Sequence, residues 1–287
     1  DRGAPTPFRL LELGPGRGTL MADILRATKG VPGFHDALCL TFVEVSPVLR
    51  ARQKEAVAPV AASWCDSVAT VPGDLPVFAV ANEYFDALPI RQFQRGAAGW
   101  SERMVHVTPE GELALGLAPQ TPLADLDHRL GDTREGELVE ICGPARADAS
   151  ALGTLIAKRG GAAIVVDYGG WRSLGDTLQA VRNHKPEPVL ASRGLADVTA
   201  HVDFEPLAQA AVAAGAAVTP MTPQGVFLER LGITQRAQAL AKGLTGAALD
   251  SHIAAHRRLT HPDEMGDLFK VIALHSDGSP PPPGLST

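Results

Sequence analysis

Three alternating glycines with an acid ahead of them are the residues in this sequence best suited to hold a ligand. Gly14, Gly16 and Gly18 follow an apolar run and precede a helical pattern, and glycine lets a backbone turn sharply and approach a ligand closely. The spacing is not the G-x-G-x-x-G of a dinucleotide site, and no P-loop G-K-[ST] occurs. Glu12, two residues before Gly14, would repel a pyrophosphate but attract an ammonium or a sulfonium. S-adenosylmethionine (SAM) carries both, so the loop indicates that cofactor.

Two further carboxylates follow later apolar runs. Glu44 stands at the end of the second run, where α/β sheets present a carboxylate to a ribose diol. Asp66 follows the third run, beside Trp64, and is expected to accept a hydrogen bond from an adenine amino group. The alternative for Glu44 is a solvated charge at a strand end.

The segment "ANEYFDALP" (81–89) ends the fourth apolar run and carries acceptor side chains. Asn82, Glu83 and Asp86 can hold a planar nitrogen group such as a guanidinium or an amide. Glu83 with Asp86 would orient a guanidinium and take up its charge, Asn82 would accept one of its hydrogens, and Tyr84 would add a flat surface. The alternative is a helix cap by Asp86 above core aromatics.

A long irregular stretch, 171–204, follows the fifth apolar run. Connections of this length inside compact domains are usually lids or binding loops. His201 and Asp203 near its end are expected to line the substrate pocket. Alternatively, His201 is a structural hydrogen-bond partner, and Asp203 caps a helix that runs to Gly215.

Apolar runs alternate with helical patterns over the first ninety residues, which predicts an α/β fold with a parallel sheet. The carboxyl ends of parallel strands share one edge, so the side chains named above should collect there. The predicted strands cover 8–13, 37–45, 60–68, 76–85, 160–169 and, late in the chain, 266–275.

The same pattern predicts four regions. Residues 1–90 form the first half of the cofactor-binding domain, and 91–137 form an inserted hairpin around Pro109-Glu110-Gly111. Residues 138–276 form the second half, with a helix at 144–158, the long loop and short helices at 225–232 and 234–243. The proline-rich segment 277–287 is predicted to be a disordered tail.

Composition limits the other possible functions. The net charge is −6 and the basic residues are scattered, which argues against gripping a nucleic-acid backbone. No apolar run is long enough to span a bilayer. Cys39, Cys65 and Cys142 lack metal-site spacing, so free thiols and no metal are expected. No leader peptide is visible, but the chain opens on Asp1, so a leader or a leading subdomain can have been removed.

Seven motifs follow one another along the chain: "ELGPGRGTLMADILRA", "VEVSPVLRARQ", "NEYFDALPIRQF", "VVDYG", "GDTLQAVRNH", "GLADVTAHVDF" and "GDLFKVIAL". In this order they resemble the MidA-type methyltransferase family, which includes the mitochondrial arginine methyltransferase that assists respiratory complex I assembly. The resemblance implies a class I methyltransferase fold, with a Rossmann-like, mostly parallel sheet and a late antiparallel strand. It implies SAM as donor and, for the complex I member, dimethylation of an arginine on a subunit.

Carried onto this chain, the resemblance gives two sets of residues. The expected cofactor positions are Glu12, Gly14, Gly16 and Glu44, and the expected acceptor positions are Asn82, Glu83 and Asp86. Family members begin with a further segment ahead of the glycine loop, which contributes to the pocket and is missing here. The sequence "EICGPARA" (140–147) also differs from the residues that family members usually have in this segment.

Two other functions stay open at this point. One is a SAM-binding assembly chaperone whose main work is to hold a partner subunit on the hairpin and long loop. The other is methylation of a nucleobase amino group, because "NEYF" echoes the Asn-Pro-Pro-aromatic motif of amino methyltransferases. The expected compartment is the cytoplasm of a bacterium, or the mitochondrial matrix of a eukaryote. The acceptor protein, the degree of methylation and the oligomeric state do not follow from the sequence.

Overall fold

The computed structural model describes residues 3–285, and their contacts divide the chain into two compact units. The sheet unit comprises the chain up to Phe85, Arg146–Gly169 and the part from Phe204 on. The inserted unit comprises Asp86–Ala145 and Gly170–Asp203. The predicted insertion at 91–137 therefore belongs to a larger unit that also takes in most of the long stretch 171–204.

The sheet unit is built on one mixed sheet with the strand order β14-β16-β9-β4-β1-β2-β3. Strands β3, β2, β1, β4 and β9 are parallel to one another. Strand β16 runs antiparallel to β9, and β14 runs antiparallel to β16. Strand order reverses at β1, and open α/β sheets bind ligands outside the carboxyl ends of the strands at such a point. The bounds are β1 Phe8–Leu13, β2 Leu38–Val43, β3 Ala62–Cys65, β4 Val77–Asn82, β9 Gly161–Gly170, β14 Ala216–Val218, β15 Thr222–Pro223 and β16 Phe269–Ser276.

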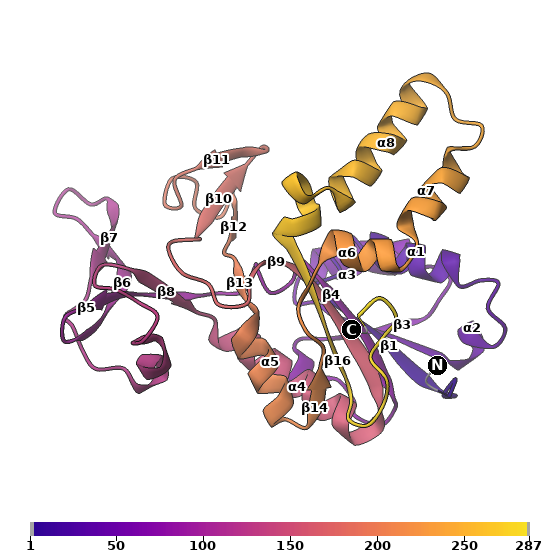
Figure 1. Ribbon diagram of the computed structural model, residues 1–287, viewed down its shortest axis with the longest axis horizontal. Coiled ribbons are helices and arrows are strands. Elements are labelled where there is room, and N and C mark those ends of the chain that lie inside the picture. Colours follow the sequence, from indigo (N-terminus) through magenta and orange to yellow (C-terminus); the bar gives the residue numbers. More distant parts are fainter. Residues whose placement is uncertain (1–2, 286–287) are drawn as a thin grey trace. The chain divides into compact units, whose positions relative to one another are not determined.

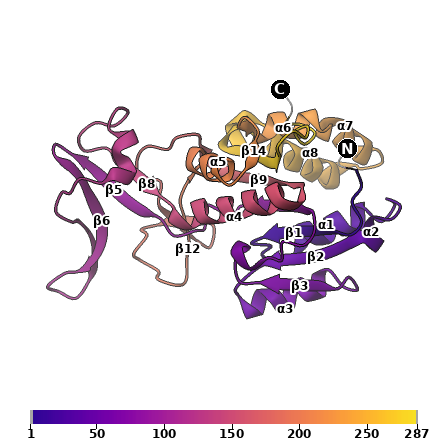
Figure 2. The ribbon, with the colours of Figure 1, turned by 90° about the horizontal axis from the view of Figure 1, so that it is seen from below.

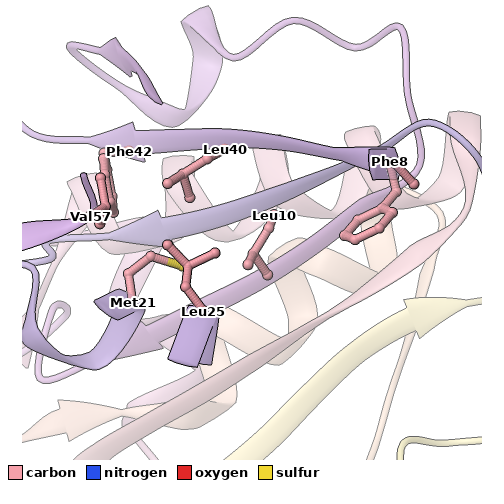
Figure 3. Packing of buried hydrophobic residues seen from close by; sticks show 8 residues of the cluster. Phe8, Leu10, Met21, Leu25, Leu40, Phe42 and Val57 are labelled. Atoms are coloured by element: carbon pink, nitrogen blue, oxygen red, sulfur yellow. The ribbon is translucent and has the colours of Figure 1, made fainter. Parts of the chain in front are cut away.

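Helices lie against the sheet (Figure 1), and apolar side chains of strands and helices are buried between them. Every residue of β1 is buried, as expected for a strand with both faces covered. Figure 3 shows Met21 and Leu25 of α1 next to Leu10 of β1, and Val57 next to Phe42 of β2. The bounds are α1 Thr19–Ala27, α2 Phe34–Ala37, α3 Pro47–Ala56, α4 Gly143–Arg159, α5 Phe204–Ala213, α6 Gln224–Arg230, α7 Ile233–Ala241 and α8 Gly246–Thr260.

Helix α3 is positioned by local sequence signals. Pro47 occupies its first turn, where the missing amide hydrogen costs nothing, and the Ser46 hydroxyl accepts a hydrogen bond from Leu49 N at 3.4 Å. Figure 2 shows β1, β2 and β3 one after another in the sheet, with α3 beside β3. This placement brings side chains of α3 to the strand ends where the site is expected.

The inserted unit contains a four-stranded antiparallel sheet, in the order β7-β6-β5-β8. The predicted hairpin is confirmed, because β6 and β7 pair antiparallel on either side of Gly111. Phe93, Trp100, Leu126 and Val139 form a small core of this unit. The bounds are β5 Arg91–Gly96, β6 Gly99–Val107, β7 Leu113–Leu117 and β8 Leu138–Ile141, with a 3-10 helix at Ala124–Arg129.

The stretch predicted to be irregular, 171–204, contains strands. Three of them pair antiparallel in the order β11-β10-β12. They are short and mostly polar, so they lack the apolar alternation by which strands are predicted. The bounds are β10 Gln179–Arg182, β11 Lys185–Glu187, β12 Asp197–Thr199 and β13 Val202–Asp203.

At the C-terminal end, one helix was not predicted and one prediction is wrong. Helix α8 was not expected, because it has no buried residues and so no apolar stripe to reveal it. The segment 277–285 is packed rather than disordered: Leu285 is 2% exposed and joins a buried cluster with Phe227 and Val271. The four prolines concealed this contact, and residues 286 and 287 lie outside the described part.

Candidate functional site

The glycine loop connects β1 to α1 through three left-handed residues. Gly14, Gly16 and Gly18 have φ of 59°, 53° and 79°, a region that non-glycine residues rarely adopt. A Cβ on Gly18 would lie 3.2 Å from the Cα of Gln53, so the third glycine lets α1 begin close to α3. A Cβ on Gly16 would meet no heavy atom within 4 Å, so space lies open in front of the middle of the loop.

Glu12 is a buried carboxylate at the end of β1. It is 3% exposed, and its Oε2 has no hydrogen-bond partner among the residues that the structure describes. Burial raises the pKa of Glu12 to about 7, because desolvation disfavours the charged form. A buried carboxylate oxygen without a partner is costly, and a cationic ligand would relieve that cost. The predicted role of Glu12 is compatible with this environment.

Glu44 follows β2, and its carboxylate is already held by two donors. Ser46 N donates to Oε1 at 2.8 Å, and Gln53 Nε2 donates to Oε2 at 3.1 Å. The backbone N–H of Glu44 donates to Cys65 O at 3.1 Å, which continues the pairing of β2 with β3. The carboxylate is therefore kept in one orientation at the strand end.

Asp66 follows β3 and is open to solvent. Its side chain is 81% exposed, and Arg50 Nη2 lies 2.5 Å from its Oδ1. Arg50 also donates to the backbone carbonyl of Glu44, from Nε at 2.7 Å and from Nη2. One guanidinium on α3 thus ties the ends of two neighbouring strands.

The segment predicted to hold the methyl acceptor, residues 82–86, is called the acceptor segment below, and it begins where β4 ends. Glu83 has φ of 50°, which breaks the strand after Asn82, and its N–H donates to Val166 O at 3.0 Å. Asn82 Nδ2 lies 3.4 Å from Glu83 Oε1, so these two predicted residues adjoin. The next turn is held by Asp167, whose buried Oδ2 accepts from Phe85 N at 3.0 Å.

Tyr84 links the acceptor segment to the glycine loop. A Cβ on Gly14 would lie 2.7 Å from Tyr84 Cδ2, so the ring packs directly against that glycine. The Tyr84 hydroxyl donates to Asp148 Oδ2 on α4 at 2.7 Å. Burial raises the pKa of Asp148, and the hydrogen bond from Tyr84 opposes that rise.

Three predicted residues lie in the inserted unit instead. Asp86 is buried, and its carbonyl accepts from Ala200 N at 3.0 Å. The backbone N–H of His201 donates to Thr177 Oγ1 at 2.9 Å, and Asp203 Oδ2 lies 3.9 Å from Arg129 Nη1. All three contacts are made with other residues of the inserted unit, so that unit fixes the positions of Asp86, His201 and Asp203.

Sequence reasoning missed the residues that support the site. Three of them lie within the family motifs "VEVSPVLRARQ" and "VVDYG", but neither motif shows which partners these side chains bind. Those partners are distant in sequence for most of the contacts, and the two residues on α3 are recognisable beforehand only by their spacing on one helix face. The four supporting residues are Arg50, Gln53, Asp148 and Asp167.

The sheet unit fits SAM by its own geometry. The unpaired Glu12 oxygen suits a cation, the open space at Gly16 admits a ligand to the backbone, and Glu44 suits a diol. Within residues 3–285 no cluster of His, Cys, Asp or Glu is arranged to hold a metal ion, and no helix is long and apolar enough to cross a membrane. The strand order and this loop define a class I SAM-dependent methyltransferase fold.

Comparison with known proteins gives the family. Residues 1–222 match the model of a family of S-adenosyl-L-methionine-dependent methyltransferases, and the chain belongs to that family. Members of this family use SAM, which confirms the expected methyl donor. The similarity to the NDUFAF7 proteins confirms the MidA-type resemblance.

Curated relatives cover most of the chain. The protein arginine methyltransferase NDUFAF7, mitochondrial, of Danio rerio is 34% identical in an alignment of 300 positions that covers 95% of this chain and 70% of the relative. The Homo sapiens protein of the same name is 33% identical in an alignment of 299 positions that covers 95% of this chain and 67% of the relative.

Solved structures agree with the fold. A COG1565 superfamily member from Burkholderia thailandensis, bound to S-adenosyl-homocysteine, has a TM-score of 0.79 and 29% identity, covering 98% of this chain and 73% of that chain. A second structure of this superfamily from the same organism has a TM-score of 0.78 and 30% identity, covering 98% and 75%.

Proposed function

We propose that this methyltransferase transfers the methyl group of SAM to a guanidinium nitrogen of an arginine in a protein. The observation that carries the proposal is the segment after β4. There Asn82 and Glu83 present amide and carboxylate oxygens, and Tyr84 packs against the glycine loop. The names of the curated relatives, protein arginine methyltransferases, support the same acceptor.

The cofactor residues divide by the part of SAM that each would hold. Glu12 would hold the cationic methionine end, the backbone at Gly14, Gly16 and Gly18 would pass close to the ligand, and Glu44 would accept from the ribose hydroxyls. We retain Asp66 as the adenine contact through Oδ2, since Arg50 contacts Oδ1. When bound, SAM supplies an electrophilic methyl group on a sulfonium.

The acceptor residues handle the charge of the guanidinium. Arginine is protonated at neutral pH, because its pKa exceeds about 12. As a nitrogen gains its methyl group it must lose one N–H proton, which we assign to the carboxylate of Glu83. Glu83 would align the planar group and stabilise its charge, and Asn82 Oδ1 would accept an N–H. Such alignment is the main contribution a protein makes to a displacement of this kind. Asp86 is proposed as a second carboxylate, with Tyr84, His201 and Asp203 as substrate contacts.

A substitution of Glu83 tests the proposal. Glu83→Gln keeps the shape and removes the charge, so we expect methyl transfer to fall by about 100-fold or more, with affinity for S-adenosylhomocysteine nearly unchanged. The assay incubates the full chain with methyl-labelled SAM and isolated subunits of respiratory complex I, and maps the modified residue by mass spectrometry.

The matched control is Glu55→Gln, an exposed glutamate on α3, which should leave transfer at the parental rate. Methylation at the parental rate by Glu83→Gln would contradict the role of Glu83. An acceptor protein with lysine in place of the mapped arginine should not be modified, because an ammonium lacks the planar fork. Label found in nucleic acid would favour a nucleobase acceptor.

We further propose that the acceptor is a complex I subunit or its bacterial equivalent, which implies the matrix or the bacterial cytoplasm. An assembly chaperone remains the second candidate, favoured by exposed apolar side chains on the hairpin. Met104, Val105 and Val107 of β6 are each at least half exposed. If Glu83→Gln abolishes transfer yet supports complex I assembly in cells, the chaperone function is the main one.

A further inference from the structure

Gln53 is the only fully buried residue of α3, and its side chain is an amide. Its side chain has no exposed surface, while its neighbours Arg52 and Lys54 on α3 are exposed. Burying an amide without partners is unfavourable, so its hydrogen bonds account for its presence. They connect three segments of the sheet unit.

The orientation of the Gln53 amide follows from the chemistry of its partners. Trp64 Nε1–H can only donate and lies 2.8 Å from Gln53 Oε1, so that atom must be the oxygen. The two N–H groups of Nε2 then face Gly16 O at 2.8 Å and Glu44 Oε2 at 3.1 Å. Two donors meet two acceptors, and every side-chain atom that can hydrogen bond has a partner.

This arrangement joins the two halves of the cofactor site. Gly16 is the middle residue of the glycine loop, whose backbone is proposed to lie close to the cofactor. Glu44 is the proposed ribose contact. Because Ser46 N holds the other oxygen of Glu44 at 2.8 Å, Gln53 supplies the second donor that fixes the plane of the carboxylate. Without it, Glu44 could rotate and the carbonyl of Gly16 would lose its partner.

We propose that Gln53 is a positioning residue that couples the glycine loop to Glu44 and so sets the preference of the site for an intact ribose. The inference rests on the proposed ribose role of Glu44. Gln53 acts through Glu44 and Gly16 and is not assigned a contact with the cofactor. Fixing binding groups in advance raises affinity because less order is lost on binding.

The test compares two ligands on the full chain by calorimetry: S-adenosylhomocysteine and its 2′,3′-dideoxy analogue. The parent protein should bind the intact product about tenfold or more tightly than the analogue, the size of a hydrogen bond to a charged group. Gln53→Met fills similar space without the amide. It should lower that preference to the level of Glu44→Gln, and the double variant should lower it no further.

Equal weakening of both ligands by Gln53→Met would overturn the proposal, because a purely structural role moves both affinities together. A preference that falls additively in the double variant would also overturn it. If Glu44→Gln leaves the preference intact, Glu44 does not read the ribose, and the inference fails with it. Product binding needs no acceptor, so none of these results depends on whether arginine is the substrate.

Two further variants guard against misfolding. Gln224→Met is the matched control, because Gln224 is a buried glutamine whose Nε2 donates to Leu259 O at 2.9 Å between α6 and α8. It should lower the melting temperature and leave the ligand preference unchanged. If Gln53→Met does not fold, Gln53→Glu tests the same point: the new oxygen faces two acceptors, so the preference for the intact ribose should again fall, and an unchanged preference would overturn the proposal.

Discussion

The donor side and the acceptor side of the proposed site are built differently. On the donor side, the ends of β1, β2 and β3 are joined by side chains of one helix, since Arg50 and Gln53 of α3 bind Glu44, Asp66 and the glycine loop. On the acceptor side, the proposed residues are divided between the sheet unit and the inserted unit. The proposed cofactor residues therefore belong to a single folded unit, whereas the proposed acceptor residues do not.

The two sides also differ in how they use backbone conformation. The donor loop uses glycines at its left-handed positions, whereas the acceptor segment places Glu83 there, with φ of 50°. A non-glycine residue in this region costs roughly 1 kcal/mol or more and is retained where the surrounding structure holds it. The bonds from Glu83 N to Val166 O and from Phe85 N to Asp167 Oδ2 supply that support.

The largest expected effect comes from filling the donor loop. Gly16→Val puts a branched side chain on a backbone with φ of 53° and into the open space in front of the loop. Strain and blockage act together, so affinity for S-adenosylhomocysteine should fall by about 100-fold or more. Calorimetry beside a melting curve checks this. Unchanged binding would show that the ligand does not approach this loop.

Acidification should weaken the donor side through Glu12. Because its pKa is raised to about 7 by burial, the carboxyl becomes protonated as the pH falls from 8 to 6. Affinity for SAM should then drop by about tenfold. In Glu12→Gln this pH dependence should disappear, and affinity should be low throughout. Binding curves at several pH values measure it, and a parental pH profile in the variant would refute the role of Glu12.

The raised pKa of Glu12 also predicts how the stability of the folded protein depends on pH. A lower pH should weaken cofactor binding but stabilise the protein without ligand. The folded-state pKa of Glu12, about 7, exceeds the ordinary 4.5, so the folded protein binds more protons than the unfolded chain between these values. Glu12 contributes up to roughly 3 kcal/mol to the free energy of unfolding below pH 4.5, and this contribution is lost as the pH rises through 7. Glu12→Gln should therefore melt at a higher temperature than the parent at pH 8, in the absence of ligand. A lower melting temperature there would contradict this.

The smallest effect is expected at Asp66. Its side chain is 81% exposed and pairs with Arg50, and exposed ion pairs contribute less than about 1 kcal/mol. Asp66→Asn keeps an oxygen that can accept from an adenine amino group, so affinity for S-adenosylhomocysteine should fall by less than about fivefold. Asp66→Ala removes that oxygen and should weaken binding further. Equal affinities for the two variants would assign Asp66 to the surface ion pair alone.

Several features followed from the sequence because their causes are local. The glycine loop is visible because left-handed turns favour glycine, and the parallel strands are visible because strands buried on both faces are continuously apolar. The start of α3 is visible in Ser46 and Pro47. Helix α8 and the strands of 171–204 were missed because they lack an apolar stripe or alternation.

The amino-acid sequence by itself determined the glycine loop, the strand-end acids and the family. The loop and the acids depend on residue types within short segments, and the family depends on several such segments in order along the chain. Only the tertiary structure decided what holds those residues in place. Gln53 meets the Gly16 carbonyl across 37 positions, Tyr84 meets Asp148 across 64 and Phe85 meets Asp167 across 82. Contacts between distant segments form only when the strands pair and the helices pack against them, so no local pattern records these partners.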